Sequence, residues 1–395
     1  MTMHPLNAVA QPKQQSPSSP QSRWSLLAWF ASYGTLTVPQ AAGPVAFSLI
    51  ALALTGDTSG GAAMILAMTV AQIFGAVPIT RQGSRFPVVP LLRALVCFRA
   101  AALVLMAAAA LWQAPFAVLV ALAALSGAVN GAAYGYLRAL LNHLAPASHL
   151  PRALGIAATL NEVAFVLAPV VASGLGSVSP VFGLVVIAFL GAIPALLIPN
   201  VTAVEVEKTA KVKASVLTPE IVLWLCCAII DGAVVAAIEI GAVSMAIEFG
   251  FAPTMAILFT VPLCLASVTG GVWVSWRNRK SSQIAVVLQF AAMSLGISLV
   301  AGGTSLTMTI AGTVIVGLVL APLSTYFSLA LDALSPPSRR PEVFALLRSA
   351  NGIGVIIAST ILALASVQAA LVAVAALILA LTFLVAFWFA RRAFI

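Results

Sequence analysis

Long apolar blocks, separated by short polar stretches, follow one another from residue 24 almost to the end of the chain. Each block has roughly the 20 residues that an α-helix needs to cross about 30 Å of hydrocarbon. The alternating runs of about 10 residues that mark membrane β-strands are absent from the sequence. The pattern therefore predicts twelve membrane-spanning helices, at residues 24–54, 60–80, 87–112, 115–138, 153–175, 179–200, 219–247, 253–275, 283–303, 306–331, 343–366 and 368–390.

Composition supports this interpretation. The chain is 62% hydrophobic and 7% charged, whereas a soluble domain carries roughly 25% charged residues. We therefore expect an all-α polytopic membrane protein in contact with the lipid bilayer. Residues 1–23 are rich in Pro, Ser and Gln, which is typical of a disordered tail, and they lack the pattern of a signal peptide. The four cysteines lie in apolar blocks and are expected to act as small hydrophobic residues, so no metal site and no cofactor is predicted.

Positive charge is distributed unevenly along the chain. All 19 Lys and Arg residues fall in the tails, in alternate connections, or in helices where they face the side of those connections. Basic residues mark cytoplasmic loops, so both termini are expected to be cytoplasmic. The net charge of +9 is then a signal of topology, and no nucleic-acid partner is expected. No G-x-x-x-x-G-K-[ST] loop is present, so ATP is not expected as a partner either.

The chain contains an internal repeat. Shifting the sequence by 190 positions aligns residues 127–168 with 317–358, and ten of these 42 positions are identical. The repeat links spans four and five to spans ten and eleven, which predicts two pseudo-symmetric six-helix bundles. The predicted organisation is a cytoplasmic tail, an N-terminal bundle, a charged cytoplasmic linker, a C-terminal bundle and a second cytoplasmic tail, at 1–23, 24–200, 201–218, 219–390 and 391–395.

The connection between spans two and three carries a recognisable motif. The stretch "AVPITRQGSR" contains Arg81, Gly83 and Arg85, and resembles the loop G-x-x-x-D-R-x-G-R-R/K of the major facilitator superfamily of secondary transporters. Ala76 stands for the first Gly of that motif and Thr80 for its Asp. The resemblance covers nearly the whole chain after residue 23. It implies twelve helices in two parallel repeats, alternating access to a central site, and a gating role for Arg81, Gly83 and Arg85.

Three carboxyl groups lie deep inside predicted spans. Asp231 lies about ten residues into span seven, roughly 15 Å deep, and Glu239 lies on the same side of that helix. Glu162 lies at a similar depth in span five. Ionisable groups at such depth are functional candidates, and low polarity disfavours the charged form, which allows proton exchange near neutral pH. Pairing with a buried cation, or lining of a wet crevice, are the structural alternatives.

Uncharged polar residues form a second set of candidates. Span four carries Asn130, Tyr134 and Arg138 at four-residue spacing beside a stripe formed by Gly127, Gly131 and Gly135. The glycines predict close helix packing, and Arg138 is expected to extend to the surface. Because the first and fourth spans of each half line the cavity in the superfamily, the resemblance favours Asn130, Tyr134, Tyr33 and Gln40 as substrate-binding residues. The alternative is that these side chains only form hydrogen bonds between helices and do not contact the substrate.

Two further residues follow from the repeat and from depth. Asn161 and Asn351 occupy equivalent positions and could bond across the interface of the halves or simply pack. Arg99 lies inside span three, where pairing within its own half, for instance with Glu162, is expected.

These features predict a proton-coupled secondary transporter that exports a small amphiphilic or cationic compound, because the charges inside the spans are mostly acidic. Uptake of a nutrient or metallophore by the same fold is one alternative. A non-transporting membrane assembly or sensor protein is another. An enzyme is not expected, because no paired catalytic groups cluster at one interface. The abundance of Ala suggests a bacterial plasma (inner) membrane.

Overall fold

A computed structural model describes residues 20–56, 59–199 and 216–393. These residues form helices joined by short connections, and they contain no strand. Twelve segments among them are long and apolar enough to cross a membrane. The predicted all-α fold with twelve spans is confirmed. Residues 1–19 of the predicted tail and residues 201–215 of the predicted linker lie outside the described residues.

The first half of the molecule contains six spans. Its helices are α1 (Pro20–Thr55), α2 (Ser59–Gly83), α3 (Val88–Leu111), α4 (Phe116–Ala128), α5 (Asn130–Leu144), α6 (Leu150–Val178) and α7 (Pro180–Leu197). A 3₁₀ turn, η1 (Ala147–His149), precedes α6. Helices α4 and α5 belong to one span in which the α-helix is interrupted at Val129. This interruption falls within the glycine stripe of span four.

The second half contains the other six spans. Its helices are α8 (Pro219–Glu248), α9 (Ile257–Arg277), α10 (Gln283–Gly302), α11 (Leu306–Leu334), α12 (Arg340–Leu364) and α13 (Val367–Ala393). The 3₁₀ turns η2 (Pro253–Ala256) and η3 (Pro337–Arg339) precede α9 and α12. Equivalent turns, η1 and η3, therefore precede the equivalent helices α6 and α12, as the repeat requires.

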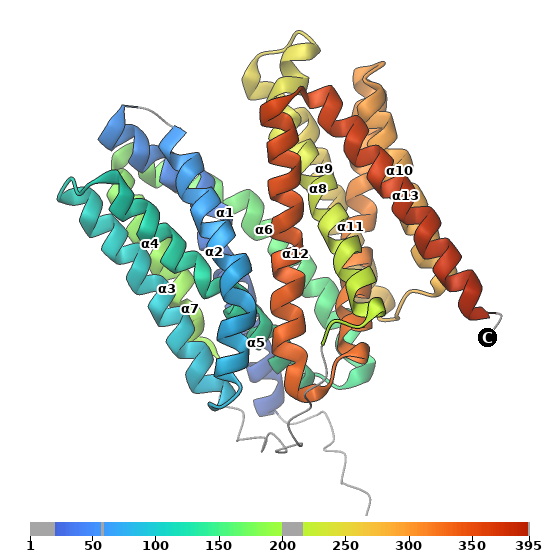
Figure 1. Cartoon of the computed structure of the whole chain (residues 1–395), viewed down its shortest axis with the longest axis horizontal. Helices are drawn as coiled ribbons and strands as arrows, with labels where there is room; N and C mark the ends of the chain where they lie inside the picture. Colours follow the sequence, from blue (N-terminus) through green and yellow to red (C-terminus); the bar gives the residue numbers. More distant parts are fainter. Residues whose placement is uncertain (1–19, 57–58, 200–215, 394–395) are drawn as a thin grey trace, which may run out of the picture.

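The two halves lie side by side, and both ends of the described chain point to the same side of the bundle (Figure 1), which we call the terminal side. Helices α2, α5 and α6 of the first half contact α9, α11 and α12 of the second. On the opposite side, which we call the far side, the halves diverge (Figure 1). The molecule is therefore closed toward its termini.

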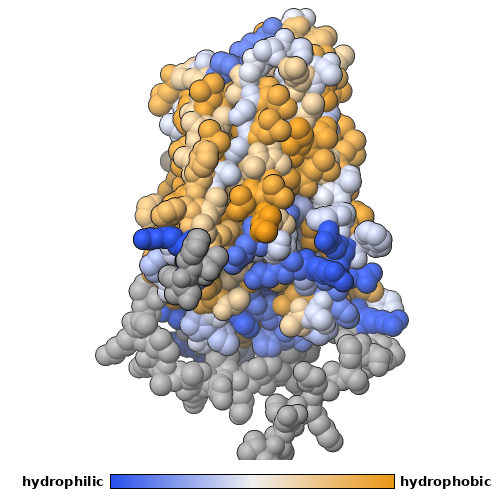
Figure 2. Space-filling model, turned by 90° about the vertical axis from the view of Figure 1, so that its right-hand side faces the viewer, coloured by the Kyte–Doolittle hydropathy of each residue, from blue (hydrophilic) through white to orange (hydrophobic). Residues whose placement is uncertain are grey.

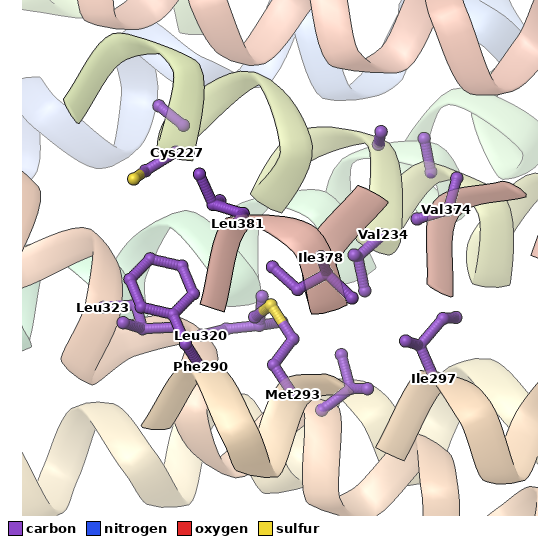
Figure 3. Close-up of a cluster of buried hydrophobic side chains, with 14 of the residues drawn as sticks. Cys227, Val234, Phe290, Met293, Ile297, Leu320, Leu323, Val374, Ile378 and Leu381 are labelled. Carbon is purple, nitrogen blue, oxygen red and sulfur yellow. The ribbon is translucent and has the colours of Figure 1, made fainter. Parts of the chain in front are cut away.

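Hydrophobic packing differs between the halves. The second half has one continuous core, in which Phe290, Met293 and Ile297 of α10 meet Ile378 and other residues of α13 (Figure 3). The first half has two separate core clusters, one nearer the terminal side and one nearer the far side. Gln40 and Arg99 lie between them along the chain, and Asn130 follows Val129, the first residue of the terminal-side cluster in its span. Polar side chains therefore interrupt the core of the first half near the middle of its spans.

The outer surface matches a lipid environment. Large apolar side chains such as Phe74 and Leu196 are 75% and 84% exposed, which would be unfavourable in water but is ordinary in hydrocarbon. Hydrophilic residues gather in a band toward the terminal side, below a largely hydrophobic surface (Figure 2).

Candidate functional site

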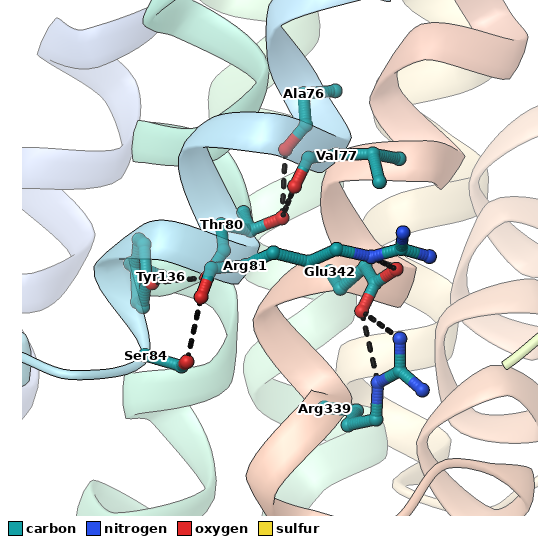
Figure 4. Close-up of polar contacts among 8 residues, drawn as sticks. All are labelled: Ala76, Val77, Thr80, Arg81, Ser84, Tyr136, Arg339 and Glu342. Carbon is teal, nitrogen blue, oxygen red and sulfur yellow. Dashed lines mark hydrogen bonds and ion pairs between the residues drawn. The ribbon is translucent and has the colours of Figure 1, made fainter. Parts of the chain in front are cut away.

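The motif between α2 and α3 closes the terminal side. Arg81, at the end of α2, donates from Nε to Glu342 Oε1 of α12 over 2.9 Å (Figure 4). The other carboxylate oxygen of Glu342 accepts from Arg339 over 2.7 Å. The side chain of Glu342 is 6% exposed and that of Arg81 is 59% exposed. The pair joins the two halves, so it must break if the terminal side opens.

The other motif residues support this contact from within the first half. Thr80, which stands at the Asp position, donates its hydroxyl to the carbonyls of Ala76 and Val77 in its own helix. A Cβ at Gly83 would lie 2.5 Å from Tyr136 Oη, so a larger residue here would displace the hydroxyl that donates to the carbonyl of Thr80. Arg85 lies exposed at the beginning of the connection to α3. The acid that pairs with the motif is thus Glu342 of the other half, which the sequence analysis did not single out.

Residues exactly one repeat apart bond to each other across the interface. Arg138 Nε donates to Ser328 Oγ over 2.7 Å, and Asn142 Nδ2 donates to Asp332 Oδ1 over 2.5 Å. Both pairs are separated by the repeat length of 190 residues. Equivalent positions can meet only near the pseudo-two-fold axis that relates the halves. Arg340 also pairs with Asp332, over 3.1 Å.

Arg138 differs from its prediction. It is 1% exposed, and its guanidinium lies 4.4 Å from the ring centroid of Phe344. The expectation that it extends to the surface is wrong, because α11 and α12 of the second half cover it. It is a buried cation at the closed interface.

Close backbone packing completes the closed side. A Cβ at Gly135 would lie 2.2 Å from the carbonyl oxygen of Pro341 in the second half; within the first half, a Cβ at Gly127 would lie 2.0 Å from the carbonyl oxygen of Met68. The predicted packing role of this glycine stripe is confirmed. On the other side of the axis, Asn278 accepts from the amide of Arg152 over 3.0 Å and donates to the carbonyl of Ser148 over 2.9 Å. The two sides of the axis are therefore held differently, one by the Arg81–Glu342 ion pair and the other by the neutral hydrogen bonds of Asn278.

A polar cluster lies next to this closed interface. Asn130 donates to Gln40 Oε1 over 2.7 Å and to Gln72 Oε1 over 2.5 Å. Gln40 also accepts from Arg348 of α12 over 2.8 Å. The hydroxyls of Tyr33 and Tyr134 lie 3.0 Å apart, and the Arg348 guanidinium lies 5.2 Å from the Tyr134 ring centroid. The structure thus brings together four predicted residues, which come from α1 and α5, and joins them to the second half.

Two members of this cluster were missed in the sequence. The sequence analysis treats Arg348 only as one of the 19 basic residues that mark topology. Its position two turns inside α12 was the signal that could have separated it from them. Gln72 lies inside an apolar span and could have been found in the same way.

The three predicted carboxyl groups form another group, which we call the acid group. Asp231 and Glu239 lie on α8, and Glu162 lies on α6. Glu162 interacts electrostatically with both, and Ser267 of α9 lies beside it. Asp231 is 8% exposed, and its Oδ1 has no hydrogen-bond partner in the described part of the chain. Within the same residues, no Lys, Arg or His forms a salt bridge with any of the three.

The remaining predicted residues have other surroundings. Arg99 donates to the carbonyl of Leu36 over 2.7 Å, so its bond stays within its own half but goes to the main chain and not to Glu162. Asn161 and Asn351 do not bond to each other, and neither amide oxygen has a partner among the described residues. The backbone of Asn351 lies against Gly232, the neighbour of Asp231. Their role at the half-half interface stays a prediction.

Twelve spans in two related halves, with polar side chains gathered between the halves, are the architecture of a secondary transporter. The sequence pattern of the Major Facilitator Superfamily matches residues 25–359, and the chain belongs to this superfamily of membrane transporters.

Solved structures share this fold. The TM-score is 0.76 with a bacterial homologue of the iron transporter ferroportin in an outward-facing state, at 14% identity over 94% of this chain and 100% of that one. It is 0.72 with the human organic anion transporter MFSD10 (TETRAN), at 15% identity over 93% and 100%. It is also 0.72 with the transporter FucP in the outward conformation, at 13% identity over 93% and 99%. No curated protein sequence matches the chain.

Proposed function

We propose that this transporter is a proton-coupled exporter of a small cationic or amphiphilic compound. It works by alternating access in a bacterial plasma membrane, with both termini cytoplasmic. The orientation rests on the basic residues, because connections with Lys and Arg preferentially remain in the cytoplasm. Arg81, Arg277 and Arg339 all lie on the terminal side, at helix ends that carry such connections.

The acid group carries this proposal. A carboxylate inside a membrane protein needs a cation, a proton or water to be stable. Asp231, Glu162 and Glu239 have no salt-bridge partner within the described residues. They remain free to take either a proton or a positively charged substrate. Since Glu162 belongs to the first half and the other two to the second, rocking of the halves changes the separation of these carboxyl groups and hence their affinity for protons.

Competition for one set of carboxylates leads to exchange. A proton and a cationic substrate cannot both neutralise the same negative charge, so binding of one lowers the affinity for the other. If only the occupied forms change conformation, inward movement of protons drives outward movement of substrate. An amphiphile would also use the aromatic rings of Tyr33 and Tyr134, whose hydroxyls meet within the polar cluster.

The contacts across the interface fit one state of this cycle. The Arg81–Glu342 pair, the Arg138–Ser328 bond and the packing of Gly135 all lie toward the terminal side. With cytoplasmic termini, this arrangement is an outward-facing state. Two proteins with the same fold have structures in an outward-facing conformation, which supports this assignment.

Proteoliposome flux measurements test the proposal. A panel of cationic dyes such as ethidium, neutral amphiphiles and anionic solutes is offered with and without an imposed pH gradient. We expect the gradient to drive accumulation of a cationic or amphiphilic member. Asp231→Asn should abolish the gradient-driven part, because the side chain can no longer exchange a proton. Glu248→Gln, which neutralises an exposed acid at the end of the same helix, is the matched control and should transport normally.

Two results would contradict the proposal. One is a normal pH dependence of flux in Asp231→Asn. The other is accumulation of only anionic or neutral polar solutes, whatever the direction of the pH gradient.

A second candidate function is uptake of a polar or anionic nutrient, including a metallophore. It is favoured by Arg348, a cation that lies with Gln40, Asn130 and Tyr134 between the halves. If this cluster binds the substrate, Arg348→Gln should abolish flux of an anionic solute, whereas Arg391→Gln, at an exposed position in α13, should not. Unchanged anion flux in Arg348→Gln would eliminate this candidate.

A further inference from the structure

A basic pocket of about 160 Å³ lies on the second half, between the end of α9, the beginning of α10 and α11. Its lining comes only from the second half and includes Trp273, Arg277, Arg279, Lys280, Thr325 and Tyr326. We propose that this pocket binds the phosphate group of an anionic phospholipid from the leaflet on the terminal side. This site is separate from the acid group and does not depend on the proposed substrate.

The charge of the pocket favours an anion. Arg277, Arg279 and Lys280 line it, and no Asp or Glu does. None of the three forms a salt bridge in the described part of the molecule. The Arg277 guanidinium lies 5.2 Å from the Trp273 ring centroid, and Lys280 Nζ lies 5.4 Å from that of Tyr326. Aromatic faces thus hold two cations at the pocket without neutralising them.

A buried hydroxyl gives independent support. Thr325 is 5% exposed and lines the pocket, and its Oγ1 has no hydrogen-bond partner among the described residues. An unpaired buried hydroxyl costs free energy unless a ligand or water completes it. Ser281 and Ser282 also line the pocket, and Ser282 is the N-cap of α10, a helix end whose main-chain amides and dipole attract anions. Phosphate oxygens could accept hydrogen bonds from all of these groups.

The surroundings favour a lipid over a soluble phosphate. Trp276, close to the end of α9, is 84% exposed, and Ile284 and Leu288, at the beginning of α10, are 75% and 64% exposed. Exposed Trp residues concentrate at the level of lipid headgroups. Basic pockets between spans on the cytoplasmic side bind anionic headgroups. A hydrophilic band meets the apolar surface on this flank of the molecule (Figure 2), so acyl chains can lie along α10 while the phosphate enters the pocket.

The test uses the purified full chain in detergent, titrated separately with phosphatidylglycerol, phosphatidylcholine and inorganic phosphate. Native mass spectrometry counts the lipids retained, and thermal unfolding reports stabilisation. We expect phosphatidylglycerol alone to be retained and to raise the unfolding temperature. Lys280→Gln should weaken its binding about fivefold, the usual contribution of one basic residue near an anionic lipid. Thr325→Val should weaken it as well, although this variant keeps every charge.

Arg391→Gln is the matched control, because it removes an exposed cation from the end of α13 in the same half. It should retain phosphatidylglycerol like the unmodified chain. Unfolding temperatures without lipid show whether each variant is folded. Equal losses in Lys280→Gln and Arg391→Gln would overturn the proposal, because binding would then follow net charge. Stabilisation by inorganic phosphate equal to that by phosphatidylglycerol would overturn the lipid assignment, and unchanged binding in Thr325→Val would overturn the assignment of the phosphate to this pocket.

Discussion

The ion pair between Arg81 and Glu342 allows a quantitative prediction about the balance between conformations. Only contacts that differ between two states change the equilibrium between them. Arg81–Glu342 joins the halves and is lost when the terminal side opens. Arg339–Glu342 lies within η3 and α12 and persists in both states. The first pair should therefore influence the equilibrium, whereas the second should influence only stability.

The magnitude follows from exposure. Because the Arg81 side chain is 59% exposed, its pair should contribute about 0.2–1 kcal/mol, as exposed ion pairs do. That free energy corresponds to a change of up to about fivefold in the ratio of closed to open molecules. We expect Arg81→Gln and Glu342→Gln each to shift this ratio toward the open state by such a factor. The double variant should shift it no further than either single variant, because both remove the same interaction.

Spin labels at Gln82→Cys and Ser338→Cys, both at exposed positions, report the distance between the halves by double electron–electron resonance. The four native cysteines are first replaced. Arg339→Gln is the control and should leave the distance distribution nearly unchanged. Additive shifts in the double variant would refute the reasoning, because they would show that Arg81 and Glu342 act through separate interactions. A shift in Arg339→Gln as large as that in Arg81→Gln would also refute it, because Arg339 does not reach the other half through its pair with Glu342.

Two further predictions concern packing. Gly135→Ala places a methyl group 2.2 Å from the carbonyl oxygen of Pro341, so we expect it to destabilise the closed state by about 1–3 kcal/mol, measured with the same labels; Gly174→Ala, with no atom within 4 Å of the added carbon, should have no such effect. Phe290→Ala empties a fully buried position in the hydrophobic core of the second half. It should lower the free energy of unfolding by about 3–5 kcal/mol, measured by denaturation in detergent. Phe383→Ala, at a residue 68% exposed, should cost far less, and equal losses would contradict the packing described.

The fold could be predicted from the sequence because lipid imposes a simple rule on it. Each span must be apolar and about 20 residues long, so composition alone locates the twelve helices. The repeat then relates the halves without reference to coordinates. Helical spacing placed Asn130 and Tyr134 on one face, and the family resemblance directed that face inward. The structure adds that they meet Gln40 and Tyr33.

Contacts between the halves could not be predicted in this way. The side chains of Arg138, Glu342 and Arg348 each depend on a helix from the opposite half, and nothing in the spacing of residues along one helix identifies that partner. Arg138 and Glu342 lie at the ends of predicted spans, where a charge ordinarily reaches water or headgroups. Burial by the other half reverses this expectation for Arg138, at 1% exposed, and Glu342, at 5%.

The bonds between Arg138 and Ser328, and between Asn142 and Asp332, have a consequence for the origin of the chain's asymmetry. An assembly of two identical copies of the first half would set one Arg138 against another, and two guanidinium groups would repel each other in a buried space. Two copies of the second half would oppose Asp332 to itself in the same manner. The two halves carry complementary groups at the axis only because their sequences have diverged. Replacing either half by a duplicate of the other would therefore remove these hydrogen bonds.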